Sequence, residues 1–226
     1  MMKNVLIAGA SGMIGQLILA NCVKNDEVLQ IISFVRKPMD NQSTKVKEVV
    51  VEDFAKLDKH SIDFNNIDAA FFCLGAYTGQ VNDALFKRIT VDFSVEFARM
   101  IKINSPNAKL CLLSGAGADR SEKSKTSFAR YKGMAENKIH AMGLNFYTFR
   151  PGYIYPVKPR KEPNFLYRLM RVLYPLLKYL GPNASITSVD LANAMVLVGR
   201  HGYDSEIIEN KEIWKLALTS LNEKTV

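Results

Sequence analysis

Short apolar runs alternate along the chain with longer segments in which apolar residues recur at helical spacing. Six runs are strand candidates, at residues 4–9, 30–35, 46–51, 69–75, 108–114 and 145–152. Runs such as AAFFCLG contain no polar residue to face water, so the strands that they form must be covered on both sides. The alternation therefore predicts an α/β fold, a doubly wound parallel sheet with helices on both faces.

The first two runs are joined by a segment in which Ile14, Leu17, Ile18 and Val23 recur at roughly helical spacing, which predicts an N-terminal βαβ unit. No internal repeat, low-complexity tract or linker divides the chain, and a length of 226 residues suits one domain with a sizeable core. We therefore expect a single domain over residues 1–226. Its least regular part is segment 153–185, which is rich in proline, tyrosine and basic residues.

A glycine-rich turn follows the first run directly. In VLIAGASGMIG, three glycines give the pattern GxxGxxG between a predicted strand and a predicted helix. Small residues let the backbone turn sharply and approach a phosphate, and the helix N-terminus offers free N–H groups to a pyrophosphate. Glycines also serve ordinary turns, but the surrounding βαβ pattern favours a dinucleotide site. The residues predicted to contact the cofactor here are Gly9, Ala10, Ser11, Gly12, Met13, Ile14 and Gly15.

The end of the second predicted strand distinguishes NAD from NADP. An acidic residue there would bind the ribose hydroxyls of NAD, whereas a basic residue accommodates the additional phosphate of NADP. The segment FVRKP places Arg36 and Lys37 at this position and no carboxylate. The alternative is that both are solvated residues at the end of a strand. NADP is therefore the predicted cofactor.

The third predicted strand ends in the segment VVVEDF. Asp53 and Phe54 lie where they could flank an adenine. Asp53 alternatively caps the helix that follows, since aspartate is a preferred N-cap residue. The sequence leaves both roles open.

Seven short motifs follow one another in a specific order, namely GASGMIG, FVRK, VEDF, FFCLGAYTG, LLSGAGAD, KGMAE and FRPGYIYP. With these motifs, over about residues 4–200, the chain resembles the short-chain dehydrogenase/reductases, particularly their atypical branch near the Tat-interacting protein and NmrA-like proteins. The resemblance implies a Rossmann core, a bound NADP and a substrate region formed by residues 153–185. It also implies site residues: Leu74, Gly75 and Ala76 along the cofactor, Ser114 at the position of the catalytic serine, Lys132 at that of the lysine contacting the nicotinamide ribose, and Pro151, Gly152, Tyr153 and Ile154 beside the nicotinamide.

The chain departs from this family four residues before Lys132. Catalytic members carry a tyrosine there, one helical turn from the lysine, whose ammonium favours the phenolate. That tyrosine exchanges a proton with the substrate while hydride moves to or from the cofactor. Here the residue is Phe128, which has the ring without the hydroxyl. Tyr131 is only one residue from Lys132, so it should point elsewhere and pack as an ordinary aromatic residue.

Other hydroxyl groups could replace the missing one. Tyr77, Tyr153 and Tyr155 could each reach the site from flanking loops. Ser114 is either a substrate-orienting hydroxyl or simply the serine of a turn at a strand end. The pattern favours an NADP-dependent oxidoreductase with a small or hydrophobic carbonyl or alcohol substrate. The alternative is a non-catalytic NADP-binding protein that senses redox state or regulates a partner.

The formal charge of +8 and the pI near 9.3 suit an anionic small molecule, a nucleic acid or an anionic membrane. No aromatic-basic motif supports specific nucleic-acid binding. Residues 164–181 have the pattern of a basic amphipathic helix, which either lies on a membrane surface or, as is more common, packs its apolar stripe on the protein. We expect the second, in a monomer or a homodimer.

The remaining composition excludes several classes. Three scattered cysteines give neither a disulfide framework nor a metal-ligand spacing, and three dispersed histidines give no metal site. No run of about 18 apolar residues is long enough to span a bilayer. We therefore expect a soluble protein of the reducing cytoplasm without a metal.

Overall fold

A parallel sheet forms the centre of the computed structural model, which describes residues 1–39, 43–77, 79–158, 171–172, 174, 181 and 183–223. Its seven strands stand in the order β3-β2-β1-β4-β5-β6-β9, and every neighbouring pair is parallel. They are β1 (Asn4–Ala8), β2 (Gln30–Val35), β3 (Val46–Val50), β4 (Ala69–Phe72), β5 (Lys109–Leu113), β6 (Asn145–Arg150) and β9 (Ile207–Glu209). The six predicted strands are confirmed, whereas β9 was not predicted.

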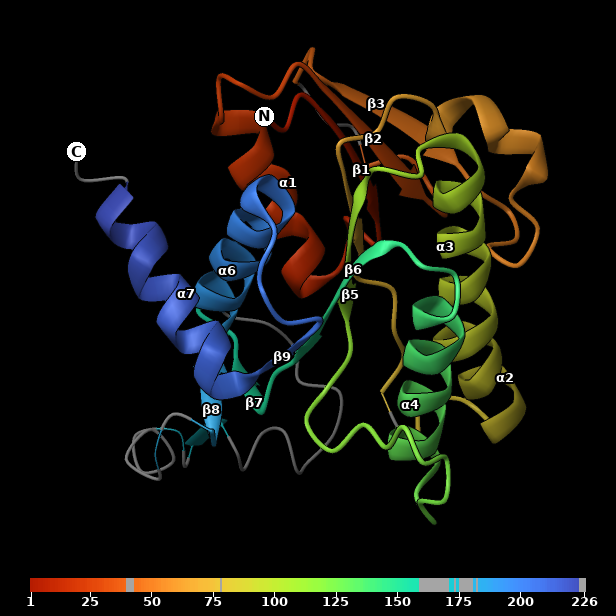
Figure 1. Cartoon of the computed structure of the whole chain (residues 1–226), viewed down its shortest axis with the longest axis vertical. Helices are drawn as coiled ribbons and strands as arrows, with labels where there is room; N and C mark the ends of the chain where they lie inside the picture. Colours follow the sequence, from red (N-terminus) through yellow and green to blue (C-terminus); the bar gives the residue numbers. More distant parts are fainter. Residues whose placement is uncertain are drawn as a thin grey trace.

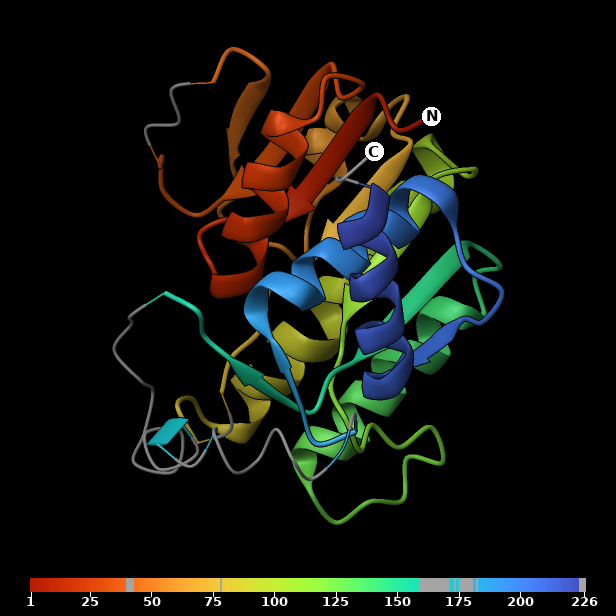
Figure 2. The same cartoon turned by 90° about the vertical axis from the view of Figure 1, so that its left-hand side faces the viewer.

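Helices cover both faces of this sheet (Figure 1). One face carries α1 (Met13–Lys24), α6 (Ser188–His201) and α7 (Asn210–Glu223), which lie in front of the sheet in Figure 2. The other face carries α3 (Phe93–Asn104) and α4 (Ser127–His140), with three shorter pieces: α2 (Asp83–Lys87), a π-helical turn at Arg88–Asp92 and a 3-10 helix at Asp58–Phe64. The predicted doubly wound α/β architecture in a single domain is confirmed.

The continuous apolar runs follow from this arrangement in three layers. In β1, Val5 and Ile7 join the core under α1 and α6, while Leu6 and Ala8 join the core under α3. All four side chains are fully buried. Because successive side chains of a strand point to opposite faces, a strand covered on both sides has no position that suits a polar residue.

The strand order reverses between β1 and β4. From β1 the chain builds outward through β2 and β3, and it then returns to β4 on the other side of β1. In an open α/β sheet, ligands bind outside the carboxyl ends of the strands at the point where the strand order reverses. The fold thus places the glycine-rich turn after β1 at the usual ligand position of such a sheet.

A separate two-stranded parallel sheet, formed by β7 (Tyr153–Tyr155) and β8 (Ser185–Thr187), brackets the predicted substrate region 153–185. Most of that region, including nearly all of the predicted basic amphipathic helix, lies outside the described residues. Within the described part, the ring of Tyr174 stacks on that of Tyr155 with centroids 3.8 Å apart. The role predicted for this region therefore stays a prediction.

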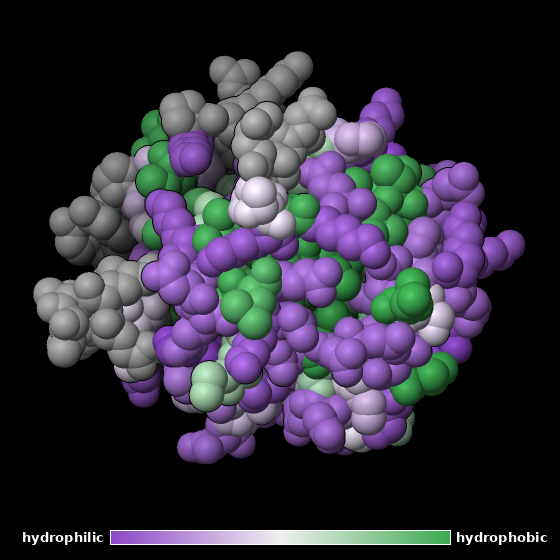
Figure 3. All heavy atoms as spheres, turned by 90° about the horizontal axis from the view of Figure 1, so that it is seen from above, coloured by the Kyte–Doolittle hydropathy of each residue, from purple (hydrophilic) through white to green (hydrophobic). Residues whose placement is uncertain are grey.

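The described surface seen in Figure 3 carries no feature that points to a membrane or protein partner. Within the described residues, no helix is long and apolar enough to cross a bilayer. The face seen from above in Figure 3 is mostly hydrophilic, with hydrophobic residues in small, separate patches. Such patches are ordinary on protein surfaces and carry no argument for a partner on this face.

Candidate cofactor and catalytic site

The glycine-rich turn after β1 is held in close contact with its neighbours. Gly9 has φ +92°, and a Cβ there would lie 2.9 Å from the backbone of Cys73 at the end of β4. A Cβ on Gly15 would lie only 2.1 Å from the carbonyl oxygen of Gly9. Both positions therefore require glycine, because the turn lies directly against β4 and α1 packs directly on the turn.

The N-terminus of α1 follows the glycine turn directly. Its N-cap residue is Gly12, no side chain caps it, and its first turn contains no acidic residue. The side chains of Ala10 and Ile14 are buried, whereas Ser11 and Gly12 are exposed. Any contact of this turn with a ligand would therefore come mainly from backbone N–H groups and from Ser11, and the helix dipole favours an anion there.

Arg36 and Lys37 follow Val35, the last residue of β2, which pairs with β1. Both side chains are exposed. Among the described residues, neither makes a hydrogen bond or an ion pair. They therefore lie at the same edge of the sheet as the glycine turn with their charges uncompensated.

The residues after β3 are engaged by the protein itself. Asp53 Oδ1 accepts a hydrogen bond from the backbone N–H of Ala55 at 3.0 Å, and Asp53 Oδ2 accepts one from Arg88 Nη2 at 2.7 Å. The N–H of Ala55 and the Arg88 guanidinium lower the pKa of Asp53. The capping role that the sequence left open thus has a counterpart, in a turn rather than in a regular helix.

The prediction that the Phe54 side chain contacts a base is not supported. Phe54 is only 2% exposed, and its ring packs against Phe34 and Phe93 in the core beside α3. A contact with an adenine stays a prediction for Asp53 and for the Phe54 backbone. The Phe54 ring is buried because it contributes more stability inside an aromatic cluster than at a solvated edge.

Two further predicted segments lie at this same edge. Leu74, Gly75 and Ala76 follow β4, and a Cβ on Gly75 would meet nothing within 4 Å. The segment from Pro151 to Ile154 follows β6 and is tied to the loop after β5, because the N–H of Ala116 donates to the carbonyl oxygen of Pro151 at 2.8 Å.

Gly152 fixes the course of the segment after β6. Its N–H donates to Asn210 Oδ1 at 2.8 Å, and a Cβ on Gly152 would lie 2.6 Å from the carbonyl oxygen of Ala184. The backbone before β8 therefore passes directly over this glycine. Pro151 itself is buried, while Tyr153 and Ile154 are partly exposed.

Lys132 reaches the carboxyl end of β5 from α4. Its Nζ donates to the carbonyl oxygen of Leu113 at 2.9 Å, and its side chain is half-buried. Burial lowers the pKa of the Lys132 ammonium to about 8, although the charge of Glu136, and that of Cys73 when it is ionised, act in the opposite direction. The lysine is therefore held at the end of the sheet with a proton that it releases more readily than an ordinary lysine does.

The residue that faces Phe128 is Gly115 and not Ser114. A Cβ on Gly115 would lie 2.6 Å from Cζ of the Phe128 ring. The ring thus covers the backbone just after β5, one helical turn before Lys132. At this place neither of the two facing residues carries a hydroxyl group.

Ser114 instead serves a buried carboxylate. Its side chain is 7% exposed, and its Oγ donates to Glu136 Oε1 at 2.6 Å. The fully buried Glu136 also accepts hydrogen bonds from Thr148 Oγ1 at 3.0 Å, Arg150 Nη2 at 2.5 Å and Arg120 Nε at 3.0 Å. Burial opposes the charge of Glu136, but hydrogen bonds from these partners, Arg150 first, outweigh burial and lower its pKa. The structure therefore does not support Ser114 as a catalytic serine.

Tyr131 points away from Lys132, as predicted. Its side chain is 7% exposed in the small apolar cluster around Phe86, and its hydroxyl donates to Asp83 Oδ2 at 2.5 Å. Ser127 Oγ donates to the other oxygen of Asp83, also at 2.5 Å. These two hydrogen bonds fasten α4 to α2.

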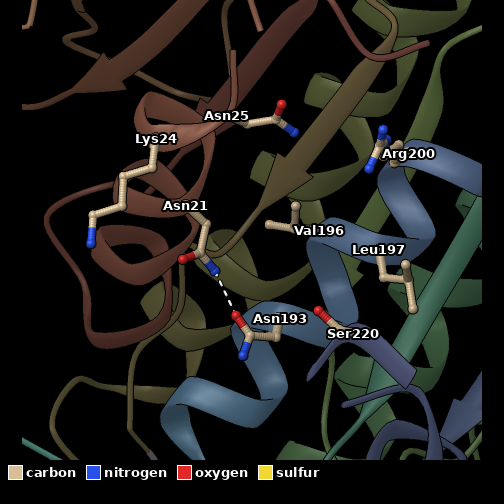
Figure 4. A pocket seen from close by; sticks show the side chains of 8 residues that line it. All are labelled: Asn21, Lys24, Asn25, Asn193, Val196, Leu197, Arg200 and Ser220. Carbon is tan, nitrogen blue, oxygen red and sulfur yellow. Dashed lines mark hydrogen bonds between the residues drawn. The ribbon is translucent and has the colours of Figure 1, made fainter. Parts of the chain in front are cut away.

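Two cavities in the described part of the chain are lined by no residue of the glycine turn. One of about 460 Å³ lies at the carboxyl ends of β6 and β9 and is lined by Ala116, Arg150, Asn183, Glu209, Asn210, Lys211 and Glu212. The other, of about 510 Å³, lies between α1, α6 and α7, where Asn21 donates to Asn193 Oδ1 at 2.8 Å (Figure 4). Because its α1 residues come from the C-terminal part of that helix, this second cavity is far from the glycine turn.

The chain offers no metal centre within its described residues, where no three His, Cys, Asp or Glu side chains converge. Cys22, Cys73 and Cys111 are free thiols. Burial raises the pKa of Cys22 and Cys73 to about 12. These thiols therefore stay protonated at neutral pH.

No protein-family model matches this chain, and no curated protein matches it in sequence. Its fold is nevertheless similar to those of solved reductase structures. Gre2 from Candida albicans, in complex with NADPH, is 16% identical with a TM-score of 0.69 over 91% of this chain and 77% of that chain. Yeast methylglyoxal/isovaleraldehyde reductase Gre2, complexed with NADPH, is 17% identical with a TM-score of 0.66 over 91% and 78%. WbmF from Bordetella bronchiseptica, in complex with NAD+, is 14% identical with a TM-score of 0.69 over 97% and 78%.

At these identities the likeness concerns the fold alone. The chain has the Rossmann-like fold of these NAD(P)-binding proteins. Its glycine turn follows β1, and the strand order reverses between β1 and β4. Its place in the atypical branch of the short-chain dehydrogenase/reductases stays a prediction.

Proposed function

We propose that this protein is an NADP-dependent oxidoreductase of the atypical short-chain dehydrogenase/reductase type that acts on a small carbonyl or alcohol compound. The observation that carries this proposal is the glycine turn, where added Cβ atoms at Gly9 and Gly15 would collide with backbone, next to the uncapped N-terminus of α1. Such a turn leaves room for a pyrophosphate and directs N–H groups at it. The fit of the residues to a dinucleotide is therefore good.

Each part of the cofactor has residues that suit it. The first turn of α1 would hold the pyrophosphate, the exposed Arg36 and Lys37 the 2′-phosphate, and Lys132 the ribose beside the nicotinamide. When bound, the cofactor supplies or accepts a hydride at its nicotinamide ring. The chain itself would orient that ring with the backbone after β4 and β6 and would have to exchange one proton with the substrate oxygen.

A second function is favoured by a specific observation. Phe128 stands where a reductase of this type would carry the tyrosine hydroxyl, and the hydroxyl of Ser114 donates to the buried Glu136. A protein that binds NADP without turning over a substrate, and thereby senses redox state, would retain the first half of the site and lose the second. The two functions differ in turnover and agree on cofactor binding.

Calorimetric titration with NADPH and NADH tests the shared part. We expect NADPH to bind at least about tenfold more tightly, or about 1.4 kcal/mol, because only NADPH carries the phosphate that Arg36 and Lys37 can bind. Arg36→Ala and Lys37→Ala should each reduce this preference. Lys138→Ala, at the opposite end of α4 from the site, is the matched control and should not change it. Equal affinities of the wild type for both cofactors would contradict the NADP assignment.

A further inference from the structure

We propose that the ammonium group of Lys132 delivers the proton to the substrate oxygen in place of the missing tyrosine. This inference rests on the proposed function and adds to it a residue role that the family resemblance does not imply, since there the lysine holds the ribose. Lys132 would thus be a catalytic residue, in contact with the reacting oxygen.

The hydroxyl groups nearest in sequence are absent or committed. Phe128, one turn before Lys132, has no hydroxyl, and it covers Gly115, which has no side chain. The hydroxyl of Ser114 already donates to the buried Glu136 at 2.6 Å, and that of Tyr131 donates to the exposed Asp83 at 2.5 Å. Either hydroxyl would have to leave a charged acceptor before it could donate to a substrate.

Lys132 is placed and charged for the task. Its Nζ lies 2.9 Å from the carbonyl oxygen of Leu113, the last residue of β5, and an ammonium that makes one hydrogen bond keeps two further protons. Lys132 as a whole residue is partly exposed.

The titratable groups that face Lys132 come from two elements. On α4, Glu136 is one turn away and is itself neutralised by Arg120 and Arg150. After β4, Cys73 keeps its proton because burial raises its pKa to about 12. The pKa of Lys132 is lowered to about 8, close to the pH at which a general acid is most effective.

The chemical step balances with these groups. In carbonyl reduction the carbonyl carbon gains the hydride that the nicotinamide supplies, and the electron pair of the C=O π bond moves to oxygen. That oxygen takes a proton from Lys132 Nζ, which becomes a neutral amine and regains a proton from water. The cofactor is oxidised by two electrons, and the carbonyl compound is reduced to the alcohol.

A labelling experiment tests the lysine without any turnover. Pulse acetylation with acetic anhydride between pH 6 and 11, followed by mass spectrometry of the peptides, reports the fraction of each lysine in its neutral form. We expect a midpoint near pH 8 for Lys132, well below the value of about 10.4 of a free lysine side chain. Lys138, an exposed lysine on the same helix, is the control for access of the reagent. NADP+ should protect Lys132 and leave Lys138 unchanged. A midpoint near 10.4 for Lys132 would overturn the proposal.

Kinetics then separates proton delivery from ribose binding. Lys132→Arg keeps the positive charge but holds its proton too tightly to donate it. We expect this variant to bind NADPH within about threefold of the wild type. Its carbonyl reduction should fall by about 10²- to 10⁴-fold. The decline in wild-type kcat above about pH 8 should be absent in it. In Lys132→Ala, added ethylamine should restore part of the rate, and Lys138→Arg should behave as the wild type.

Each other outcome counts against the proposal. Full turnover by Lys132→Arg would show that another group donates the proton. Tight NADPH binding with no turnover of any carbonyl compound by the wild type would refute proton delivery and leave the cofactor assignment standing. Failure of the wild type to bind NADPH would refute the proposed function, and the inference with it.

Discussion

The two halves of the candidate site differ in what they are built from. The cofactor half consists of the glycine turn at residues 9–15 with Arg36 and Lys37, and it relies on backbone groups, a helix end and exposed charge. The proton-transfer half consists of Gly115, Phe128 and Lys132, and it would rely on particular side-chain atoms. The first half offers groups that suit a dinucleotide, whereas the second lacks the expected tyrosine hydroxyl, and its expected serine hydroxyl, that of Ser114, donates to Glu136.

Cofactor binding and proton transfer depend on different kinds of group in this fold. Backbone N–H groups are present whatever the side chains are, so a phosphate-binding turn survives as long as its glycines do. A proton donor, in contrast, depends on one or two atoms, and a single substitution removes it. A Rossmann-like chain can therefore keep its cofactor and change or lose its reaction.

The largest expected effect comes from restoring the missing hydroxyl. Phe128→Tyr would place a phenol one helical turn from Lys132, whose ammonium favours the phenolate. We expect reduction of ordinary aldehydes and ketones, which Lys132 alone supports only slowly in the wild type, to rise by about 10²-fold or more. The measurement is NADPH consumption over a panel of carbonyl compounds.

Phe128→Leu is the matched control for this variant, because it also changes the packing on Gly115 but adds no hydroxyl. Robust turnover by the wild type that is unaffected by Phe128→Tyr would show that the proton-transfer half is complete as it stands. Tyr77→Phe and Tyr153→Phe would then distinguish these tyrosines from Lys132 as the donor, since both tyrosines lie in segments at this edge of the sheet.

A smaller effect is expected in the cofactor half. In Gly15→Ala the new Cβ would lie 2.1 Å from the carbonyl oxygen of Gly9, so the turn and α1 must move apart. We expect a loss of about 1–3 kcal/mol in the free energy of unfolding. NADPH affinity should fall at least about tenfold, since the N–H groups no longer converge.

Urea unfolding and calorimetry measure these two effects. Gly75→Ala supplies the stability control, because its new Cβ meets nothing within 4 Å although it lies at the same edge. If Gly15→Ala binds NADPH as tightly as the wild type does, the glycine turn is an ordinary turn and the cofactor half is wrongly placed.

The smallest effect concerns a residue that now belongs to neither half. Ser114→Ala removes one hydrogen bond to the buried Glu136. We expect it to lower the free energy of unfolding by about 1.5 kcal/mol, as for a hydrogen bond to a charged group. Carbonyl reduction should stay within about twofold of the wild type.

Thr148→Val removes a second hydroxyl from the same carboxylate and should have a similar effect on stability, measured by urea unfolding. If Ser114→Ala loses most of its turnover but keeps the stability of the wild type, Ser114 belongs to the proton-transfer half of the site.

The parts of the fold that the sequence revealed are those that depend on local pattern. Apolar runs predicted six strands because a strand that is buried on both faces is apolar at nearly every position. The three residues of β9 form no such apolar run, since this strand exists through its pairing with β6. The absence of the family's tyrosine at position 128 was also predicted from the sequence. Two residues that are four positions apart on a helix lie on the same face, whatever surrounds them.

What only the tertiary structure decided are contacts between elements that are distant along the chain. The spacing of residues along the chain does not predict that Gly115 contacts Phe128 on α4. Nor does it predict that Ser114 binds Glu136, which two arginines neutralise. The packing of Phe54 on Phe34 is equally a result of the tertiary structure. The sequence by itself determined a parallel sheet with a glycine turn followed by basic residues. The packing of α4 on β5 and β6 decided that the Ser114 hydroxyl binds Glu136, because a buried carboxylate is stable only when it is hydrogen-bonded and paired.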